Sequence, residues 1–307
     1  MAFGGSPAVT RAVANNFIPE LWSDEVIGAY KKQLVMANVV TKLSHKGKKG
    51  DKVYIPVPAR GAASLKAADT QVTLSAATNT VIGIDIATHY EYSKLIEDIA
   101  EVQSLASMRK FYTDDAGYAL ATRVDSDLFA LSEGFQGGVL GGAGNALFEK
   151  AVIGSDGATL YTGGSDNAAD LTDAAIRKMI LTLDSADVPM DNRVMVIPPV
   201  AYNEILSLPR FTEQTHIGNG DAIKTGQIGM IYGMDIMVSN NCPTVGTSRV
   251  GVMMHKDALV LAEQVGIRSQ TQYKQEYLGD LFTADTIYGV GILRASSGVA
   301  FVVDAAN

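Results

Sequence analysis

The sequence predicts an α+β fold, and three observations in its 307 residues predict it. One uninterrupted helical pattern runs from Tyr92 to Leu131. Two alternating, strand-like segments, residues 51–58 and 81–92, flank a polar stretch. Strand and helix patterns then alternate between residues 166 and 264, and further alternating strands follow.

The helical pattern is unusually long. Its apolar residues recur at steps of three and four, which places them on one face of a helix: Tyr92, Leu95, Ile96, Ile99, Val102, Leu105, Ala106, Tyr112, Ala116, Ala119, Leu120, Val124, Leu128 and Leu131. At about 1.5 Å per residue, such a helix would be about 60 Å long. Gly117 leaves a second interpretation open, in which two ordinary core helices are separated at this glycine.

Composition excludes several classes of protein. Hydrophobic residues make up 47% and charged residues 19% of the chain, and no apolar run is long enough to span a membrane. The first 16 residues lack the features of a secretory signal. The single cysteine, Cys242, excludes an internal disulfide framework, and we interpret it as an inert small residue. The net charge of −8 argues against a protein that holds nucleic acid on a basic face.

The search for chemistry finds no enzymatic motif. The glycine-dense run 137–145 contains neither a lysine-ending phosphate loop nor a dinucleotide fingerprint. The four histidines are scattered, without the spacing of metal ligands. Asp125 and Asp127 lie two apart on the predicted helix and therefore point to different sides. We expect no catalytic residue, no metal site and no cofactor.

The N-terminal region predicts an arm and a first helix. Residues 1–16 are small and polar, as in an extended arm that needs a partner. The apolar residues of the following segment recur at helical spacing: Leu21, Trp22, Val26, Tyr30 and Leu34. Trp22, the only tryptophan, is interpreted as a core anchor.

Residues 45–90 predict a projecting β-hairpin. Pro56 and Pro58 cannot donate ladder hydrogen bonds, so the first strand belongs at a sheet edge. The tip, residues 61–80, has almost no large apolar side chains and cannot build a core. A projection of this length is unusual in a monomer but useful against a neighbouring subunit. The basic cluster at the start of this segment is either a solvated loop or a phosphate-binding patch; it consists of Lys46, Lys48, Lys49 and Lys52.

The C-terminal half predicts a compact α/β unit and a set of closing strands. A glycine-rich connection, residues 134–164, precedes it. The expected elements are a helix at 170–187, a strand at 193–197 buried on both faces, a helix at 199–208, and strands at 234–239 and 250–255. Strands at 268–273, 286–293 and 299–303 are expected to pair beside the long helix.

This order of parts resembles that of tailed-bacteriophage major capsid proteins with the Hong Kong 97-type fold. The resemblance covers nearly the whole chain. The order of its parts carries more weight than any single short sequence segment, or phrase, that agrees with the family. The phrases that agree with it are Ile18-Pro19-Glu20-Leu21-Trp22, Gly50-Asp51-Lys52-Val53-Tyr54-Ile55-Pro56, Ile96-Glu97-Asp98-Ile99, Arg193-Val194-Met195-Val196-Ile197-Pro198-Pro199, Gly229-Met230-Ile231-Tyr232-Gly233-Met234 and His255-Lys256-Asp257-Ala258-Leu259.

The resemblance implies a division of the chain and a structural function. The parts would be an N-terminal arm with the first helix (1–44), an extended loop (45–90), a peripheral domain with the spine helix (91–133), a glycine-rich connection (134–164), an axial domain (165–264) and return strands of the peripheral domain (265–307). Pentamers and hexamers of the chain would form an icosahedral shell around a double-stranded DNA phage genome. The protein would assemble in the host cytoplasm and be located in the virion.

The resemblance also implies partners. They are the chain itself, a portal, decoration proteins and a scaffolding protein, which we expect to be separate because the sequence begins directly with a short arm. Packaged DNA would be enclosed without tight sequence-specific binding, and no membrane is involved. Some relatives are covalently cross-linked through a loop lysine and an asparagine of a neighbour. Lys66 is the only lysine well out on this loop, and no matching asparagine is found, so we expect no cross-link.

The candidate subunit-interface residues lie in the first helix and the loop. They are Phe17, Ile18, Trp22, Lys46, Lys48, Lys49, Lys52, Tyr54 and Lys66. The lysines at 46, 48, 49 and 52 are expected to meet acidic groups of a neighbour, for example on its spine helix.

Two alternatives stay open at this point. The chain could be a soluble α/β enzyme with a site in residues 166–264 and the glycine-rich stretch as a lid. It could also be a non-viral encapsulating shell protein of the same fold.

Overall fold

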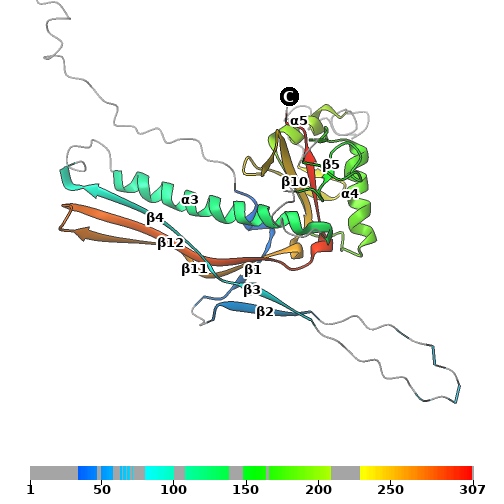
Figure 1. Cartoon of the computed structure of the whole chain (residues 1–307), viewed down its shortest axis with the longest axis horizontal. Helices are drawn as coiled ribbons and strands as arrows, with labels where there is room; N and C mark the ends of the chain where they lie inside the picture. The colour runs from blue at the N-terminus through cyan, green and yellow to red at the C-terminus, as the bar shows by residue number, and fades with distance from the viewer. Residues whose placement is uncertain are drawn as a thin grey trace, which may run out of the picture.

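The structure is a computed structural model that describes most of the chain (Figure 1). The described residues are 34–46, 50–57, 63, 65–66, 68–69, 71, 80–99, 108–137, 148–163, 166–208 and 229–305. The strands form a four-stranded sheet, a seven-stranded sheet and a two-stranded hairpin. The predicted first helix and the candidates Phe17, Ile18, Trp22, Lys48 and Lys49 lie outside the described residues.

The four-stranded sheet has the order β1-β11-β12-β4. Its strands are β1 (Thr41–Ser44), β11 (Leu259–Lys274), β12 (Gly279–Ile292) and β4 (Thr88–Glu97). Strand β1 is parallel to β11, and the other neighbours are antiparallel. Helix α3 (Met108–Leu131) lies along one face of this sheet (Figure 1). Ala116 and Leu120 of the helix pack on Phe282 and Ala284 of β12.

The long helix is shorter than its sequence pattern predicts. Residues from Tyr92 to Glu97 belong to β4 and pair in register with β12, so this part of the prediction is wrong. The apolar positions of this segment fit a helix and an edge strand equally well, and pairing with β12 decides between them. Over its 24 residues α3 is about 36 Å long. It continues through Gly117, so the interpretation as two helices separated there is also wrong.

The seven-stranded sheet forms the centre of the predicted α/β unit. Its order is β5-β13-β10-β6-β8-β7, and β9 pairs separately with β10. The strands are β5 (Val152–Ile153), β6 (Arg193–Ile197), β7 (Met230–Ile231), β8 (Met234–Val238), β9 (Thr244–Val245), β10 (Ser248–His255) and β13 (Gly298–Val303). As predicted, every residue of β6 is buried. The predicted strands at 234–239 and 250–255 are confirmed as β8 and β10.

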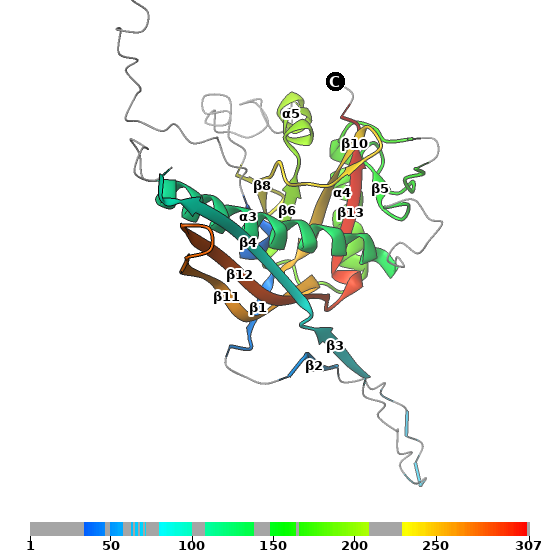
Figure 2. The same cartoon turned by 60° about the vertical axis from the view of Figure 1, so that its left-hand side comes forward.

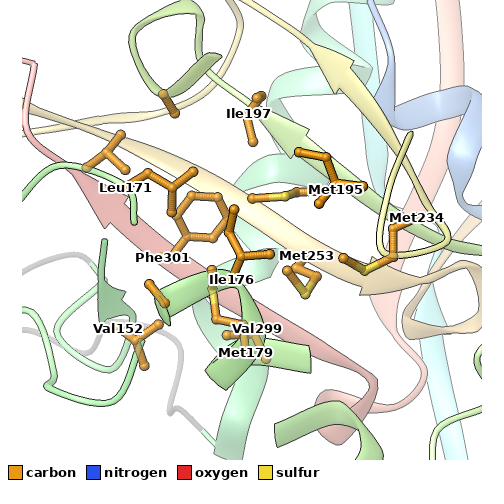
Figure 3. Packing of buried hydrophobic residues seen from close by; sticks show 14 of the residues in the cluster. Val152, Leu171, Ile176, Met179, Met195, Ile197, Met234, Met253, Val299 and Phe301 are labelled. Atoms are coloured by element: carbon orange, nitrogen blue, oxygen red, sulfur yellow. The ribbon is translucent and has the colours of Figure 1, made fainter. Parts of the chain in front are cut away.

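Two helices cover one face of this sheet. They are α4 (Asp173–Ser185), which the Thr172 side chain caps, and α5 (Pro199–Ser207), which starts at a proline. Both helices match the sequence prediction. Figure 3 shows Ile176 of α4 beside Phe301 and Met179 of α4 beside Val299, in the apolar cluster between these helices and the sheet.

The opposite face of the seven-stranded sheet packs against α3 and so connects the α/β unit to the four-stranded sheet. Val194, Val196 and Val252 on this face pack with Leu128 and Phe129 of α3. The structure also describes several short helices: α1 (Met36–Val39) and the 3-10 helices η2 (Ser132–Gly137), η3 (Lys256–Ala258) and η4 (Ala295–Ser297). No helix within the described ranges is long and apolar enough to cross a bilayer.

Two parts of the chain pair differently from their sequence assignment. Strand β13 pairs with β10 and β5, so the last strand belongs to the seven-stranded sheet and not beside the long helix. Residues 148–163, expected in a glycine-rich connection, include β5 and the buried Phe148 and Tyr161. The first correction arises because an apolar strand does not reveal which of two sheets will pair with it, and the second because β5, with two residues, is too short to show a period.

Candidate interaction surface

The hairpin consists of β2 (Lys52–Val57) and β3 (Thr80–Asp85), paired antiparallel as a separate two-stranded sheet. It lies on the side of the four-stranded sheet opposite to α3 (Figure 2). The expected hairpin is thereby confirmed, but its second strand ends at Asp85 because residues 88–97 pair with β12 instead. Both strands have one unpaired edge, which accommodates Pro56 in β2.

The two faces of the hairpin differ. Directly paired residues share a face of a sheet. The face toward the body contains Val53 opposite Ile84, which is 2% exposed. The other face carries Tyr54, 65% exposed, opposite Gly83, and Pro56 opposite Val81, 57% exposed. Tyr54, Pro56 and Val81 form an outward stripe that belongs to none of the apolar clusters of the described residues.

The root of the hairpin is anchored to the body. Ile84 and Ile86 pack on Val260 and Ala262 of β11. The Ile86 backbone N–H donates to the Asp51 carbonyl at 2.7 Å. This hydrogen bond joins the residue before β2 to the residue after β3. The direction in which the hairpin projects is therefore set by this apolar contact.

Gly289 of β12 makes the close approach of the root possible. A Cβ atom at this position would lie 2.4 Å from the Asp85 carbonyl oxygen and 3.1 Å from the Ile86 Cα atom. We expect Gly289→Ala to lower the free energy of unfolding by about 1 to 3 kcal/mol, because backbone must shift to admit the methyl group. Guanidinium denaturation checks this. Gly229→Ala, at a position where no atom of the described residues lies within 4 Å of the added carbon, is the control. Equal midpoints for both variants would contradict the anchoring.

Two of the candidate lysines that the structure describes, Lys46 and Lys52, have acidic partners in their own chain. The Lys46 Nζ atom lies 3.1 Å from Glu263, and the Lys52 Nζ atom lies 3.0 Å from Asp85. The hydrogen bond to Asp85 is the main cause of the raised pKa of Lys52. Lys66 is exposed, beside the fully exposed Leu65. Both pairs are exposed, and the expected contacts of these lysines with a neighbour stay a prediction.

Asp125 connects the start of the described chain to α3 and to the α/β unit. Its side chain is fully buried. One oxygen accepts the backbone N–H groups of Val35 and Met36 at 3.2 and 2.8 Å, and the other accepts Asn241 Nδ2 at 3.0 Å. Burial raises the pKa of Asp125, against the opposing effect of these hydrogen bonds. Asp127 instead accepts the Tyr288 hydroxyl at 2.7 Å, so the two carboxylates do point to different sides.

A second exposed apolar area lies at the far end of the four-stranded sheet. The residues are Leu95, Ile99, Tyr273, Tyr277 and Leu278, all at least 40% exposed. The Tyr273 hydroxyl donates to Asp98 at 2.8 Å, and the Asp98 N–H donates to the Leu278 carbonyl, which ties the end of β4 to the turn between β11 and β12. Sequence reasoning missed this area, because Leu95 and Ile99 were assigned to the buried face of a helix.

A half-buried carboxylate connects two loops of the α/β unit. Asp166 accepts hydrogen bonds from the side chains of Tyr161, Thr247 and Ser248.

Cys242 is buried, and burial raises the pKa of its thiol to about 12, in agreement with an inert small residue. Among the side chains that the structure describes, no three of His, Cys, Asp and Glu lie close enough to hold a metal ion.

Glu204 of α5 is a buried carboxylate whose charge is only partly compensated. Its Oε2 atom accepts the Leu171 N–H at 2.6 Å, and within the described chain Oε1 has no hydrogen-bond partner. Burial raises the pKa of Glu204 from 4.5 to about 7, with a further contribution from Asp170 and Asp304. Between these two values the folded state binds more protons than the unfolded state, so the free energy of unfolding falls as pH rises.

Glu204→Gln is expected to remove most of this pH dependence. Relative to the parent, the variant should gain about 2 kcal/mol between pH 5 and pH 8, because glutamine has no charge to bury. Urea denaturation at both pH values measures the difference, with the exposed Glu276→Gln as control. A constant offset between the Glu204 variant and the parent at the two pH values would contradict the assignment.

Comparisons with known proteins agree on one family. The family model of a phage capsid protein matches residues 108–300. The major capsid protein of Escherichia phage T5 is 23% identical over 262 residues, which cover 82% of this chain and 52% of that protein. The chain thus spans about half the length of this curated relative.

Solved structures are similar over almost the whole chain. One from Mycobacterium phage Che8 is 25% identical, with a TM-score of 0.74, and covers 94% of this chain and 97% of that one. The capsid structure of the cyanophage P-SCSP1u is 19% identical, with a TM-score of 0.75, and covers 95% and 94% of the two chains. Because the family model covers well over half of the residues, this chain belongs to the phage capsid protein family, with the Hong Kong 97-type fold that its order of elements indicated.

Proposed function

We propose that this chain is a major capsid protein whose copies assemble, as pentamers and hexamers, into an icosahedral shell around a double-stranded DNA phage genome. Its role is structural, without catalysis, and its place is the virion. The observation that carries this proposal is the outward stripe of the hairpin, in which Tyr54, Pro56 and Val81 are presented to solvent.

Physical reasons support a second copy as the partner of this stripe. A two-stranded hairpin is marginally stable in water unless its faces are covered. The root uses only the inward face, so the outward face is available to another subunit. Closed point-group symmetry repeats such a contact for every copy, and exposed apolar areas of this kind mark interaction sites.

The candidate interface residues keep their place in this proposal. Tyr54 contributes through its exposed ring, and Lys46 and Lys52, which pair with Glu263 and Asp85 in their own chain, stay proposed contacts with acidic groups of a neighbour. Lys66 stays a candidate contact of the loop. Phe17, Ile18, Trp22, Lys48 and Lys49 are proposed contacts from the sequence alone.

The shell requires partners of several kinds. We propose a separate scaffolding protein, a portal and decoration proteins in addition to the chain itself. The net charge of −8 favours a wall that encloses DNA without binding it tightly. The same fold could build a non-viral compartment, and the contents of purified particles, genome or protein cargo, distinguish the two.

Negative-stain electron microscopy of the purified protein, together with its mass distribution in solution, tests the proposal. Closed shells, or rings of five and six subunits, are expected, with coexpressed scaffolding protein if the chain alone gives capsomers only. A uniform dimer or tetramer under both conditions would overturn the proposal and favour the α/β enzyme.

A further inference from the structure

Three successive cross-strand pairs make up the outward face of the hairpin: Lys52 with Asp85, Tyr54 with Gly83, and Pro56 with Val81. The first pair is an ion pair at the base of the hairpin, where the Lys52 Nζ atom lies 3.0 Å from the carboxylate. The third pair is apolar on both strands. In the middle pair one partner has no side chain, so the presence of Gly83 needs a physical explanation.

Gly83 meets none of the common requirements for a glycine within a strand. Its φ is not positive, and the register of β2 and β3 continues unbroken past it, so it marks no bulge. Among the described residues, no backbone atom of another segment lies within 4 Å of the position that a Cβ atom would occupy. Glycine weakens a strand, because it loses more conformational freedom and packs no side chain. The explanation therefore lies in the side chain opposite.

The ring of Tyr54 lies over Gly83. A Cβ atom at position 83 would be 3.3 Å from the Tyr54 Cε1 atom and 3.5 Å from its Cδ1 atom. The shorter distance is below the usual carbon–carbon contact of about 3.5 to 4.0 Å. An aromatic ring that covers a glycine across a strand pair is held against the sheet. Tyr54 nevertheless stays 65% exposed, so its ring presents most of its surface to solvent.

We propose that Gly83 positions the Tyr54 ring for contact with a second copy of the chain. With no side chain at position 83, the ring lies down on the hairpin and forms a flat apolar surface with Pro56 and Val81. A neighbouring subunit packs on this surface. A side chain at position 83 would lift the ring, which would then stand between the two subunits and hold them apart. This role of Gly83 rests on the proposed function, and it makes the orientation of Tyr54, as well as its apolar character, a condition for association.

Assembly of full-length variants tests this positioning. The measured quantity is the lowest subunit concentration at which capsomers or shells form, followed by sedimentation and electron microscopy. Gly83→Val should raise this concentration at least about tenfold, because aromatic anchors carry much of the binding energy of an interface. Gly83→Ala should raise it less, since one added carbon displaces the ring less. Gly229→Ala, where no atom of the described residues lies within 4 Å of the added carbon, should assemble like the parent.

Thermal unfolding of the same variants separates positioning from a general loss of stability. Valine is a better strand former than glycine, and alanine has less conformational freedom to lose. The exposed ring can also move into solvent without disturbing the core. Both variants should therefore unfold at or above the temperature of the parent. A lower unfolding temperature for both would show that Gly83 serves the fold of the subunit and would overturn the proposal.

A second substitution tests whether the ring is the cause of the effect. In Tyr54→Ala/Gly83→Val the larger side chain moves from one strand to the other, so the outward face stays flat and apolar. This variant should assemble at a concentration at least about threefold lower than Gly83→Val alone, which is the coupling expected of two residues in contact. Without such a rescue, the valine would not act through the ring, and the proposal would be overturned.

The aspartate variant of the stripe, Tyr54→Asp/Val81→Asp, distinguishes this role from the proposed interface itself. If Gly83→Val assembled like the parent while the aspartate variant formed no shells, the positioning role would be overturned and the interface would stand. If both variants assembled like the parent, the outward face would not be an interface, and both proposals would fail.

Discussion

Tyr54→Asp/Val81→Asp is expected to give a folded subunit that forms no closed shells. Both side chains lie on the outward stripe, 65% and 57% exposed in the single subunit, so the substitutions cost its fold little. In an assembled contact each carboxylate would be buried without a partner. A penalty of at least about 3 kcal/mol per contact weakens association roughly a hundredfold or more, and closed symmetry repeats it for every copy.

Electron microscopy and sedimentation measure the loss of particles, and circular dichroism with thermal unfolding confirms that the subunit is folded. Tyr54→Phe/Val81→Ile, which keeps the apolar stripe, should assemble like the parent. Shells from the aspartate variant in normal yield would show that the outward face is not an interface. An unfolded aspartate variant would mean instead that the stripe stabilises the subunit itself.

Asp125→Ala is expected to lower the free energy of unfolding by about 3 kcal/mol or more. The substitution leaves the buried N–H groups of Val35 and Met36 without their acceptor, and it removes one acceptor of the Asn241 amide, which also donates to Thr122 and Ser126. Each such donor costs about 1 to 3 kcal/mol. Guanidinium denaturation measures the change.

Asp125→Asn provides the matched comparison for that result. It keeps an oxygen for the two backbone N–H groups and loses only the contact with Asn241, where two amide NH₂ groups would meet. The loss should therefore be about 1 to 2 kcal/mol. If alanine and asparagine destabilised equally, the backbone hydrogen bonds at the start of α1 would not be the source of the effect.

The sequence was most informative where an element has one strong period and clear ends. The helix from Asp173 to Ser185 has a threonine cap and a regular apolar stripe, and the strand from Arg193 to Ile197 is apolar throughout. The helix pattern reflects burial of one face, and the strand pattern reflects burial of both faces. The structure confirms both because local spacing was sufficient to specify them.

The candidate interaction surface could be predicted only in part. Alternation between residues 52 and 57 already placed Tyr54 and Pro56 on one face, but Val81 joins them only through the register with β3. The same register pairs Lys52 with Asp85 within the subunit, which the sequence pattern does not reveal. Charge in a sequence indicates that a partner is needed, and it does not say where that partner lies.

The sequence by itself determined the order of the elements, the projecting hairpin, the apolar faces of its regular helices and strands, and through these the family. Tertiary structure decided that residues 92–97 form a strand, that β13 joins the seven-stranded sheet and that the hairpin root packs beside Gly289. The physical reason is that side-chain spacing is a local property of the chain. Strand partners and close backbone approaches depend on residues up to about 200 positions away, and only the assembled fold brings these together.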